Sequence, residues 1–299
     1  MPRTTPPRPL DVEALFPEVA AHRRDAVRLH PRPGAPGVRD SSMGGPLLWP
    51  RTEPWPHCGD DHPRTAFSPP PAPEPLPLVP VLQLFAADVP ELPFPPGTDL
   101  LQVLWCPFDH EAGYVPRPEL RWRSSSDCAD ARPAAPPRPA GAADDYLPDP
   151  CVLHPERVVD YPTWDLPEEV HDALEERFEQ LEEETGWSYW SHLSVSAGIK
   201  AGGYPTWTQD PYWPDCPGCG HRMEHLLTVN SREFDGESWR TWLPVEDAPA
   251  TGTVWDLPYE ERTRIQCPPG LMLGDMGGIY LFDCRRCPDR PYAYHSDGS

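Results

Sequence analysis

Two pairs of cysteines in the second half of the chain have the spacing of a zinc knuckle. Cys216 and Cys219 enclose Pro-Gly, and Cys284 and Cys287 enclose Arg-Arg. Four thiolates from two such turns form the closed tetrahedral site of structural zinc, with no position left for water. The two pairs lie farther apart in sequence than in a compact zinc ribbon, so strands must bring them together. The alternative is a set of buried or redox-active thiols.

The first half of the chain offers a second candidate site with a mixed ligand set. Cys58 is followed by His62, and Cys106, which ends an apolar run, is followed by His110 at the same spacing. Two cysteines and two histidines also bind zinc tetrahedrally. Such a set would be a divergent copy of the four-cysteine site, but CxxxH pairs are common by chance, so the pattern alone does not favour it. The alternative is a decayed site with unrelated surface histidines.

An internal repeat connects the two candidate sites. The segments GGPLLWPRTEPWPHCG (residues 44–59) and GGYPTWTQDPYWPDCPGCG (residues 202–220) share a Gly-Gly pair, two tryptophans, a proline and a cysteine at one constant offset. Tryptophan and cysteine are rare, so these matches in register indicate a duplication. The tryptophans are core residues in the plainest interpretation, but a groove bordered by proline and tryptophan can also hold an extended peptide. The four residues concerned are Trp49, Trp55, Trp207 and Trp213.

No arrangement of residues in the sequence indicates a catalytic centre. His221, Glu224 and His225 spell the HxxEH pattern of inverted zinc proteases, but a β-like run follows directly. In a strand these histidines lie too far apart to share a metal ion. Neither a phosphate-binding GxGxxG or GK[ST] motif nor a GxSxG nucleophile motif is present. We therefore expect a non-enzymatic protein, with a zinc- or thiol-dependent hydrolase or redox enzyme as the alternative.

The charge and composition of the chain restrict its partners. Its 299 residues include 25 Lys+Arg and 47 Asp+Glu, which gives a formal net charge of −22. Such a field repels phosphate backbones and anionic lipids, so neither nucleic acid nor a membrane is an expected partner. A basic protein or peptide would be attracted; the alternative is that the acidity only keeps the protein in solution. The sequence contains no membrane-spanning apolar run and starts without a secretory signal, which predicts a cytoplasmic protein. In that compartment, nine cysteines favour thiols or metal ligands over disulfides.

Short apolar runs bounded by proline predict a mainly β protein with few long helices. The 47 prolines remove backbone donors and interrupt helices. A helix is predicted after Asp165 as N-cap, with Gly186 as its C-terminal signal. Other helices are predicted within 11–29 and near 256–262, and strands at 78–85, 100–106, 190–196, 223–229 and 278–284.

These elements predict an internally duplicated, pseudo-two-fold β-sheet protein of the α+β class with peripheral helices and a zinc-knuckle pair. Two similar sheets packing together would bury the two sets of tryptophans, and both repeats would form one compact unit. The predicted parts are a proline-rich tail and N-terminal helix (1–39), a first β-rich repeat (40–123), a Pro/Ala-rich linker (124–163), and a helix plus second β-rich repeat (164–299).

The sequence resembles the YwqG-like family of bacterial proteins. The resemblance rests on the Gly-Gly pair followed by tryptophan and Trp-Pro, on Cys216 to Cys219, and on GLMLGDMGGIYLFDC at residues 270–284. More distantly, the chain is similar to the C-terminal domain of programmed-cell-death-protein-two-like proteins. These resemblances imply a protein-binding module, either a chaperone of the kind that serves a ribosomal protein or a toxin-immunity factor. They imply no catalytic residue.

Overall fold

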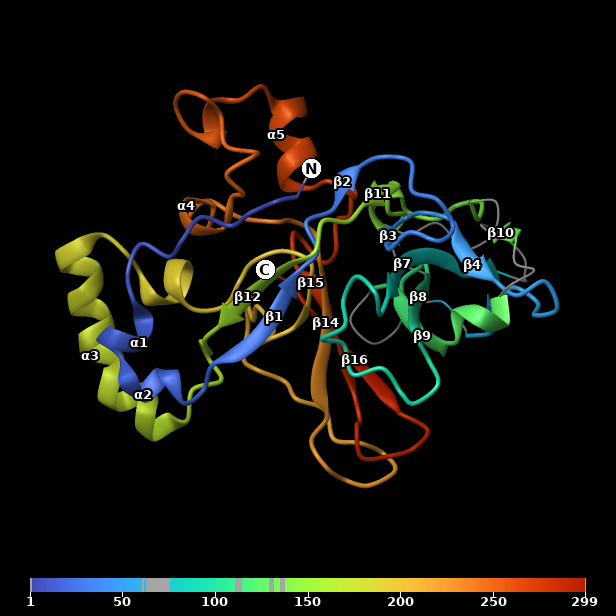
Figure 1. The fold of residues 1–299 in the computed structure, drawn as a ribbon, viewed down its shortest axis with the longest axis horizontal. Helices are drawn as coiled ribbons and strands as arrows, with labels where there is room; N and C mark the ends of the chain where they lie inside the picture. Colours follow the sequence, from blue (N-terminus) through green and yellow to red (C-terminus); the bar gives the residue numbers. More distant parts are fainter. Residues whose placement is uncertain are drawn as a thin grey trace.

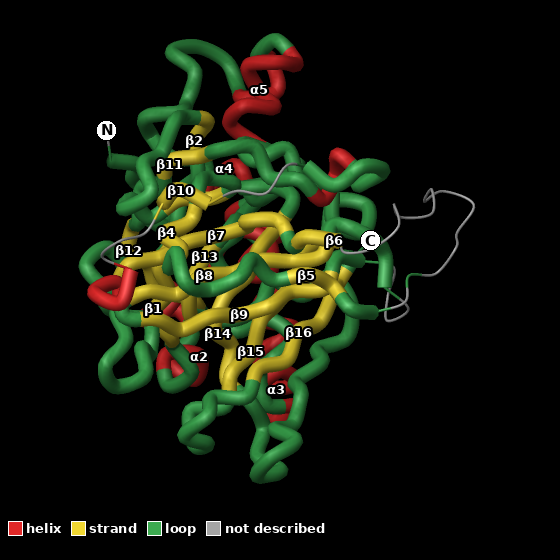
Figure 2. Tube along the Cα trace, turned by 90° about the vertical axis from the view of Figure 1, so that its right-hand side faces the viewer, coloured by secondary structure: helices red, strands yellow, loops and turns green. Residues whose placement is uncertain are grey.

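Antiparallel β-sheets make up most of the structure. The computed structural model describes residues 2–60, 62, 76–110, 115–128, 132–134 and 138–298. As the sequence predicts, the described chain is mostly β with a few helices, and it forms two six-stranded and two two-stranded sheets. Figure 2 shows the two large sheets one in front of the other.

The strands of the first large sheet, which we call sheet A, are in order β12 (Glu156–Asp160), β1 (Arg24–Arg28), β13 (Lys200–Gly202), β14 (Glu224–Asn230), β15 (Gly278–Asp283) and β16 (Tyr292–Asp297). Those of sheet B are β2 (Arg32–Pro33), β11 (Cys151–Val152), β3 (Ser42–Met43), β7 (Val79–Phe85), β8 (Leu100–Cys106) and β9 (Arg117–Arg123). The small sheets pair β10 (Arg132–Ala134) with β4 (Leu47–Trp49), and β5 (His57–Cys58) with β6 (Leu76–Pro77).

Helices cover the ends of this arrangement (Figure 1). Within the described residues, none of them is both long and apolar enough to cross a membrane. The helices are α1 (Val12–Leu15), α2 (Pro17–Ala20), α3 (Glu168–Thr185), α4 (Trp239–Trp242) and α5 (Tyr259–Gln266). Single turns are η1 (Ser125–Cys128), η2 (Asp144–Tyr146) and η4 (Val254–Asp256), and η3 (Tyr189–Leu193) is a π-helix.

The two large sheets match in strand order and in register. In sheet B, Phe85 of β7 lies opposite Leu100 of β8, and at the same place in sheet A, Asn230 of β14 lies opposite Gly278 of β15. Each of these strand pairs also has one register shift at the corresponding position, between Pro80 and Leu82 in sheet B and between His225 and Leu227 in sheet A. Bulges re-aim side chains locally, so a matched bulge means matched side-chain directions.

Each sheet includes a strand from the other half of the chain. β1, near the N-terminus, pairs with β13 of sheet A, whereas β11, which follows the first half, pairs with β3 of sheet B. The chain therefore crosses between the sheets twice, once in the segment 29–31 and once in the segment 153–155. The two crossing segments are joined where the N–H of His154 donates to the carbonyl of Leu29 at 2.8 Å.

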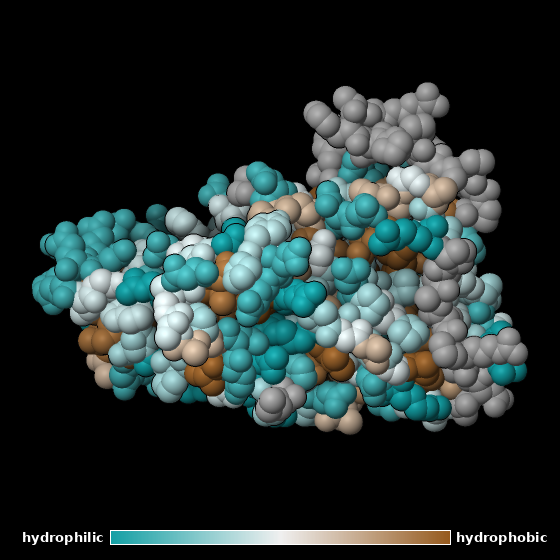
Figure 3. All heavy atoms as spheres, turned by 90° about the horizontal axis from the view of Figure 1, so that it is seen from above, coloured by the Kyte–Doolittle hydropathy of each residue, from teal (hydrophilic) through white to brown (hydrophobic). Residues whose placement is uncertain are grey.

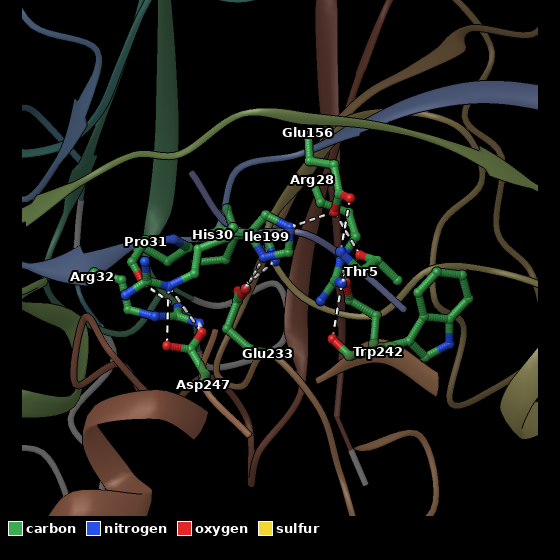
Figure 4. A network of polar contacts seen from close by, with 12 residues as sticks. Thr5, Arg28, His30, Pro31, Arg32, Glu156, Ile199, Glu233, Trp242 and Asp247 are labelled. Atoms are coloured by element: carbon green, nitrogen blue, oxygen red, sulfur yellow. Dashed lines mark hydrogen bonds and ion pairs between the residues drawn. The ribbon is translucent and has the colours of Figure 1, made fainter. Parts of the chain in front are cut away.

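A network of buried polar side chains surrounds the crossing (Figure 4). Arg28 is fully buried and donates to the carbonyls of Ala197 and Trp242 and to the hydroxyl of Thr5. His30 Nε2 lies 2.9 Å from Glu156 Oε2. Burial, with the nearby Arg28 charge, lowers the pKa of His30 to about 4, so this histidine is neutral in the folded protein at pH 7.

The main core lies between the sheets and draws side chains from both. Along β8, Leu101, Val103 and Trp105 point into this core, whereas Leu104 and Cys106 point to the opposite face. β15 alternates in the same way. The tryptophan pairs belong to separate clusters on the outer faces, so the prediction that packing of sheet on sheet buries them is wrong. The period of two along each strand sends neighbouring residues to opposite faces, and in both strands both faces are covered.

Two predicted elements have a different form in the structure. The segment 11–29, predicted to be a helix, contains only the four-residue helices α1 and α2 before strand β1. Pro17 starts a new helix instead of continuing the first, and pairing of β1 with two neighbours fixes the rest as strand. The segment 190–196, predicted as a strand, lies mainly in the π-helix η3, where Tyr189 and Leu193 pack against α3. Tertiary packing outweighed the alternating pattern.

The predicted linker and the predicted helix cap also require correction. Residues 124–163 contain β11 and β12, which are paired strands of sheets B and A, so the end of this segment belongs to the folded core. α3 starts at Glu168 with Pro167 at the N-cap, not Asp165, while Gly186 ends it in the left-handed conformation as predicted. The strands predicted at 78–85, 100–106, 223–229 and 278–284 are confirmed as β7, β8, β14 and β15, and the helix near 256–262 as α5.

Lys200, the single lysine of the chain, forms a fully buried ion pair with Asp160. Its Nζ lies 2.6 Å from Asp160 Oδ2, and the carboxylate also accepts the backbone N–H groups of Ser196 and Tyr204. A side chain on Gly203 would clash with this carboxylate. The second glycine of the repeated Gly-Gly pair therefore makes room for the buried charge.

We expect Lys200→Met to destabilise the protein by about 3–5 kcal/mol, because it leaves the Asp160 carboxylate buried and uncompensated. As a control, Arg138→Gln removes an exposed pair with Asp144 and should cost less than about 1 kcal/mol. Urea unfolding measures both. Equal stabilities of the two variants would contradict a structural role for the buried pair.

Stability should fall as the pH is lowered from about 6.5 toward 4. Unfolded histidines take up a proton near pH 6.5, whereas burial holds the pKa of His30 near 4 and that of His225 near 3. At these two histidines the unfolded state thus binds more protons in this range, so their titration favours unfolding in acid. Urea unfolding at pH 7, 6 and 5 gives the slope, and His225→Gln should make it shallower. An unchanged slope would show that His225 is not the group responsible.

Candidate metal centres

The structure brings the four cysteines of the two knuckles together. The Sγ atoms of Cys216 and Cys287 are 3.8 Å apart, and those of Cys219 and Cys284 are 3.6 Å apart. All four sulfurs lie within 4.8 Å of one another. Thiolates around one tetrahedral ion at about 2.3 Å are about 3.8 Å apart. The cluster therefore has the composition and spacing of a four-thiolate metal site.

Backbone hydrogen bonds shape the two knuckle turns. The N–H of Gly220 donates to the carbonyl of Cys216 at 2.8 Å, and Gly220 has the positive φ (+69°) that such a tight turn requires. The second turn follows directly after β15, which places Cys284 at the end of a central strand of sheet A. The two cysteine pairs are far apart in sequence, and the pairing of β14 with β15 brings them together in space.

The mixed residues of the first half also form a single cluster. His62 Nε2 is 3.1 Å from Cys106 Sγ, and Cys58 Sγ is 3.7 Å from His62 Nε2 and 3.5 Å from His110 Nε2. These separations bracket the roughly 3.6 Å expected between sulfur and nitrogen ligands of one tetrahedral ion. The structure thus brings together the four residues of the possible second site, and they could hold a metal ion.

The histidines of the mixed cluster are oriented for ligation. His110 Nδ1 is 2.9 Å from the carbonyl of Phe108, and a hydrogen bond there leaves Nε2 free to face the sulfurs. Asp60 lies beside the cluster, with Oδ2 3.8 Å from His110 Nε2, and it forms an ion pair with Arg117. A cavity of about 150 Å³ borders the cluster on this side.

Local hydrogen bonds favour the thiolate form of one cysteine in each cluster. The bond from the Cys106 thiol, with help from His110 and against the effect of burial, lowers the pKa of Cys58 to about 4. Burial raises the pKa of Cys284, but the backbone N–H groups of Cys287 and Arg286 outweigh it and bring the value to about 7. Thiolates are the species that bind metal ions.

The repeated tryptophans pack beside the two clusters. Trp49 and Trp207 are buried, each in an outer-face cluster with two cysteines of the neighbouring candidate metal centre, whereas Trp55 and Trp213 are partly buried. The indole nitrogens of Trp207 and Trp213 both donate to Asp165, at 2.8 and 2.5 Å. Asp165, which the sequence pattern predicts to be a helix cap, therefore fixes one tryptophan pair. No local sequence signal links it to residues forty positions away.

The protease-like histidines do not form a site. His221 is exposed in the loop before β14, whereas His225 is buried within the strand and its Nε2 lies 3.0 Å from Thr228 Oγ1. The remaining cysteines, Cys128, Cys151 and Cys267, lie outside both clusters.

Comparisons with known proteins give this chain no family. No protein-family model matches it, and no curated protein matches it significantly. The geometry and chemistry of the described side chains therefore carry the functional argument.

We expect two metal ions per chain, one in each cluster. Cys216→Ser should remove one equivalent and lower stability, because binding at a closed site contributes directly to folding. Cys58→Ser should remove the other equivalent, and the control Cys267→Ser should remove neither. Metal content by mass spectrometry, with thermal unfolding of the same samples, checks this. A folded wild-type protein purified without any metal would contradict it.

Proposed function

We propose that this chain is a zinc-stabilised, non-enzymatic module that binds another polypeptide. The observation that carries the proposal is the presence of two four-ligand clusters at corresponding positions of two matching sheets. Zinc is the metal that best suits both a four-cysteine and a two-cysteine, two-histidine set in tetrahedral geometry. Four protein ligands match the closed sites that serve folding, not the open sites that serve catalysis.

An internal duplication accounts for this correspondence. The shared Gly-Gly, tryptophan and cysteine pattern, the equal strand order and the equal bulges support two copies of one unit. Cys106 at the end of β8 and Cys284 just after β15 occupy matching places, as do Cys58 and Cys216. On this proposal the mixed site is the altered copy, in which two cysteines are replaced by histidines.

The acidic character of the surface supports a basic partner. Helix α3 buries Leu174, Phe178 and Leu181, and its other positions are rich in exposed carboxylates. In Figure 3 the left end of the molecule, where Figure 1 places α3, is largely hydrophilic. Together with the net charge of −22, this face would attract a polypeptide rich in lysine or arginine. A cytoplasmic chaperone-like or immunity-type role, as implied by the resemblance to the YwqG-like family, is consistent with this chemistry.

A zinc-dependent enzyme is the second candidate, and the cavity beside the mixed cluster favours it. Cys58, Cys106, Asp60 and Arg117 line this cavity, so a carboxylate and a cation lie next to the proposed metal. Catalysis would require one protein ligand to give way to water. Cobalt substitution separates the two candidates. A four-coordinate cobalt absorption spectrum that does not change when azide is added would show that no coordination position is open, and would exclude the zinc-enzyme function.

Purification of the tagged chain from its native host at low salt is the direct test of partner binding. A stoichiometric basic polypeptide, released by high salt and accompanied by about two zinc ions per chain, is the expected result. Recovery of the folded chain alone, across growth conditions and at low salt, would reject the polypeptide-binding function while leaving the zinc sites intact.

The carboxylates of α3 should contribute to that binding. Replacing Glu176, Glu179 and Glu183 by glutamine should weaken binding of the recovered polypeptide by about tenfold or more at low salt, with less effect at high salt. A matched control replaces three exposed acids elsewhere, Asp210, Glu260 and Glu261, by their amides. Calorimetry at two salt concentrations measures the difference. Equal losses in both triple variants would show that net charge, not the α3 face, is responsible.

A further inference from the structure

Sheet A borders a cavity that no part of the proposed function uses. It has a volume of about 220 Å³ and lies where the ends of β14 and β15 meet the segments around residues 163, 190 and 207. Its lining combines aromatic rings with polar side chains and backbone. The residues on which the argument rests are Trp164, Trp190, Thr206, Asn230, Arg232 and Gly278.

In sheet B the matching space is filled. Leu48, Phe85 and Leu100 pack there with Cys128 of η1 in one apolar cluster. The register places Asn230 and Gly278 of sheet A where sheet B has Phe85 and Leu100. If Leu48 is also matched with Thr206, three large apolar side chains of sheet B correspond to Thr206, Asn230 and Gly278 in sheet A. These residues are too small to fill the same space.

The match of Leu48 with Thr206 rests on two observations. Each residue immediately precedes the repeated tryptophan, Trp49 or Trp207. The carbonyl of each also accepts a hydrogen bond from the corresponding position of a central strand, from Gln102 Nε2 to Leu48 and from the Tyr280 hydroxyl to Thr206. The cavity is therefore a difference between two otherwise matching sheets.

The polar groups of the cavity suit an anion. Thr206 Oγ1 is buried and has no hydrogen-bond partner among the described residues. Arg232 is half-buried, and within the described chain its guanidinium takes part in no hydrogen bond or ion pair. Asp235 also lines the cavity; burial raises the pKa of its carboxyl, but hydrogen bonds from Ser238 and Glu237 and the nearby Arg232 charge outweigh this effect, so the Asp235 carboxylate lies within electrostatic range of Arg232 without forming an ion pair with it. In a chain of net charge −22, a half-buried arginine that forms no ion pair with any carboxylate of the described residues can still accept an anionic ligand.

Aromatic rings give the cavity flat walls. Trp164 is 58% exposed although it stacks on Trp190, with ring centroids 5.8 Å apart and planes 23° apart. Trp207 forms another wall and packs edge-to-face on Tyr280. Such rings favour a planar or aromatic group on the ligand. Trp207 also belongs to the cluster that contains Cys216 and Cys284, so the metal site supports this wall.

The rim beside β15 is fixed by the backbone. The carbonyl of Gly277 accepts hydrogen bonds from both the N–H and the hydroxyl of Ser231, at 3.0 and 2.7 Å. A side chain on Gly277 would clash with the carbonyl of Asp297. The site is therefore largely formed before a ligand enters, which is typical of small-molecule pockets.

We propose that this cavity binds a small ligand that joins a carboxylate to an aromatic or similarly planar group. The carboxylate pairs with Arg232 and accepts the hydroxyl of Thr206, and the planar group lies against the tryptophans. Such a ligand is either a free aromatic acid or the C-terminal residue of a polypeptide. The inference goes beyond the proposed function and does not depend on the acidic face of α3.

Tryptophan fluorescence gives a direct test, because three tryptophans line the cavity. N-acetyl-phenylalanine should change the fluorescence saturably, whereas its amide, which lacks the charge, should bind at least about tenfold more weakly. Arg232→Gln should cause a similar loss for the acid. The matched control Arg264→Gln removes an exposed charge on α5 and should leave the affinity unchanged. Equal binding of acid and amide would overturn the proposal.

Filling the cavity provides a second, independent variant. Thr206→Leu installs the residue found at the matching position of sheet B and removes a buried hydroxyl without a partner, so the fold should be as stable or more stable. Binding of N-acetyl-phenylalanine should be lost. Retained affinity in this folded variant would show that the ligand binds elsewhere.

The source of the ligand is resolved by a matched pair of probes. A hexapeptide that ends in phenylalanine with a free carboxylate is compared with N-acetyl-phenylalanine. Tighter binding of the peptide assigns a polypeptide C-terminus, and tighter binding of the small acid assigns a free acid. Absence of saturable binding by both probes overturns the proposal, while recovery of a basic partner through α3 would be unaffected.

Discussion

The exchange of strands between the two sheets is the constraint on which the rest of the structure depends. β1 pairs with β12 and β13, and β11 pairs with β2 and β3, so each sheet needs a strand from the other half of the chain. Arg28 and His30 are buried where the chain crosses, and Lys200 and Asp160 form their ion pair on strands that flank β1. Buried charges tolerate little displacement, which fixes the register of the crossing strands.

Covering the outer faces of the sheets is the second structural requirement. β8 and β15 are buried on both faces, yet the proline-rich segments around them supply few helices that could cover the outer one. Tryptophans and the cysteine-containing clusters take that place. Ordering the loops against the strand ends costs chain entropy, and the apolar contacts there offset this cost only in part. A metal ion bound by these loops and strand ends would supply the remaining stabilisation. The outer faces of the two sheets differ at Thr206: sheet A has a cavity there, where sheet B is filled by apolar side chains.

The sequence by itself determined the central strands and identified the residues of the two candidate metal clusters. Apolar runs bounded by proline identified β7, β8, β14 and β15, because hydrophobicity and chain breakers act locally. Cysteine is rare and the spacing of each pair reflects a tight turn, so residue type and spacing were enough to indicate the four-cysteine cluster, whereas the mixed set was only suggested by the repeat and needed the structure to show that its four residues lie together. The short helix at α5 and the end of α3 at Gly186 followed from local signals of the same kind.

Only the tertiary structure decided how these parts are combined. Nothing local in residues 24–28 distinguishes a strand from the continuation of a helix; pairing with β12 and β13 decides it. Asp165 has the pattern of a helix cap until Trp207 and Trp213 are placed beside it. The cavity at Thr206, Asn230 and Gly278 is visible only against the filled space of sheet B. Sequence signals reach a few residues, whereas sheet pairing and burial join residues far apart in the chain, and these contacts set the final arrangement.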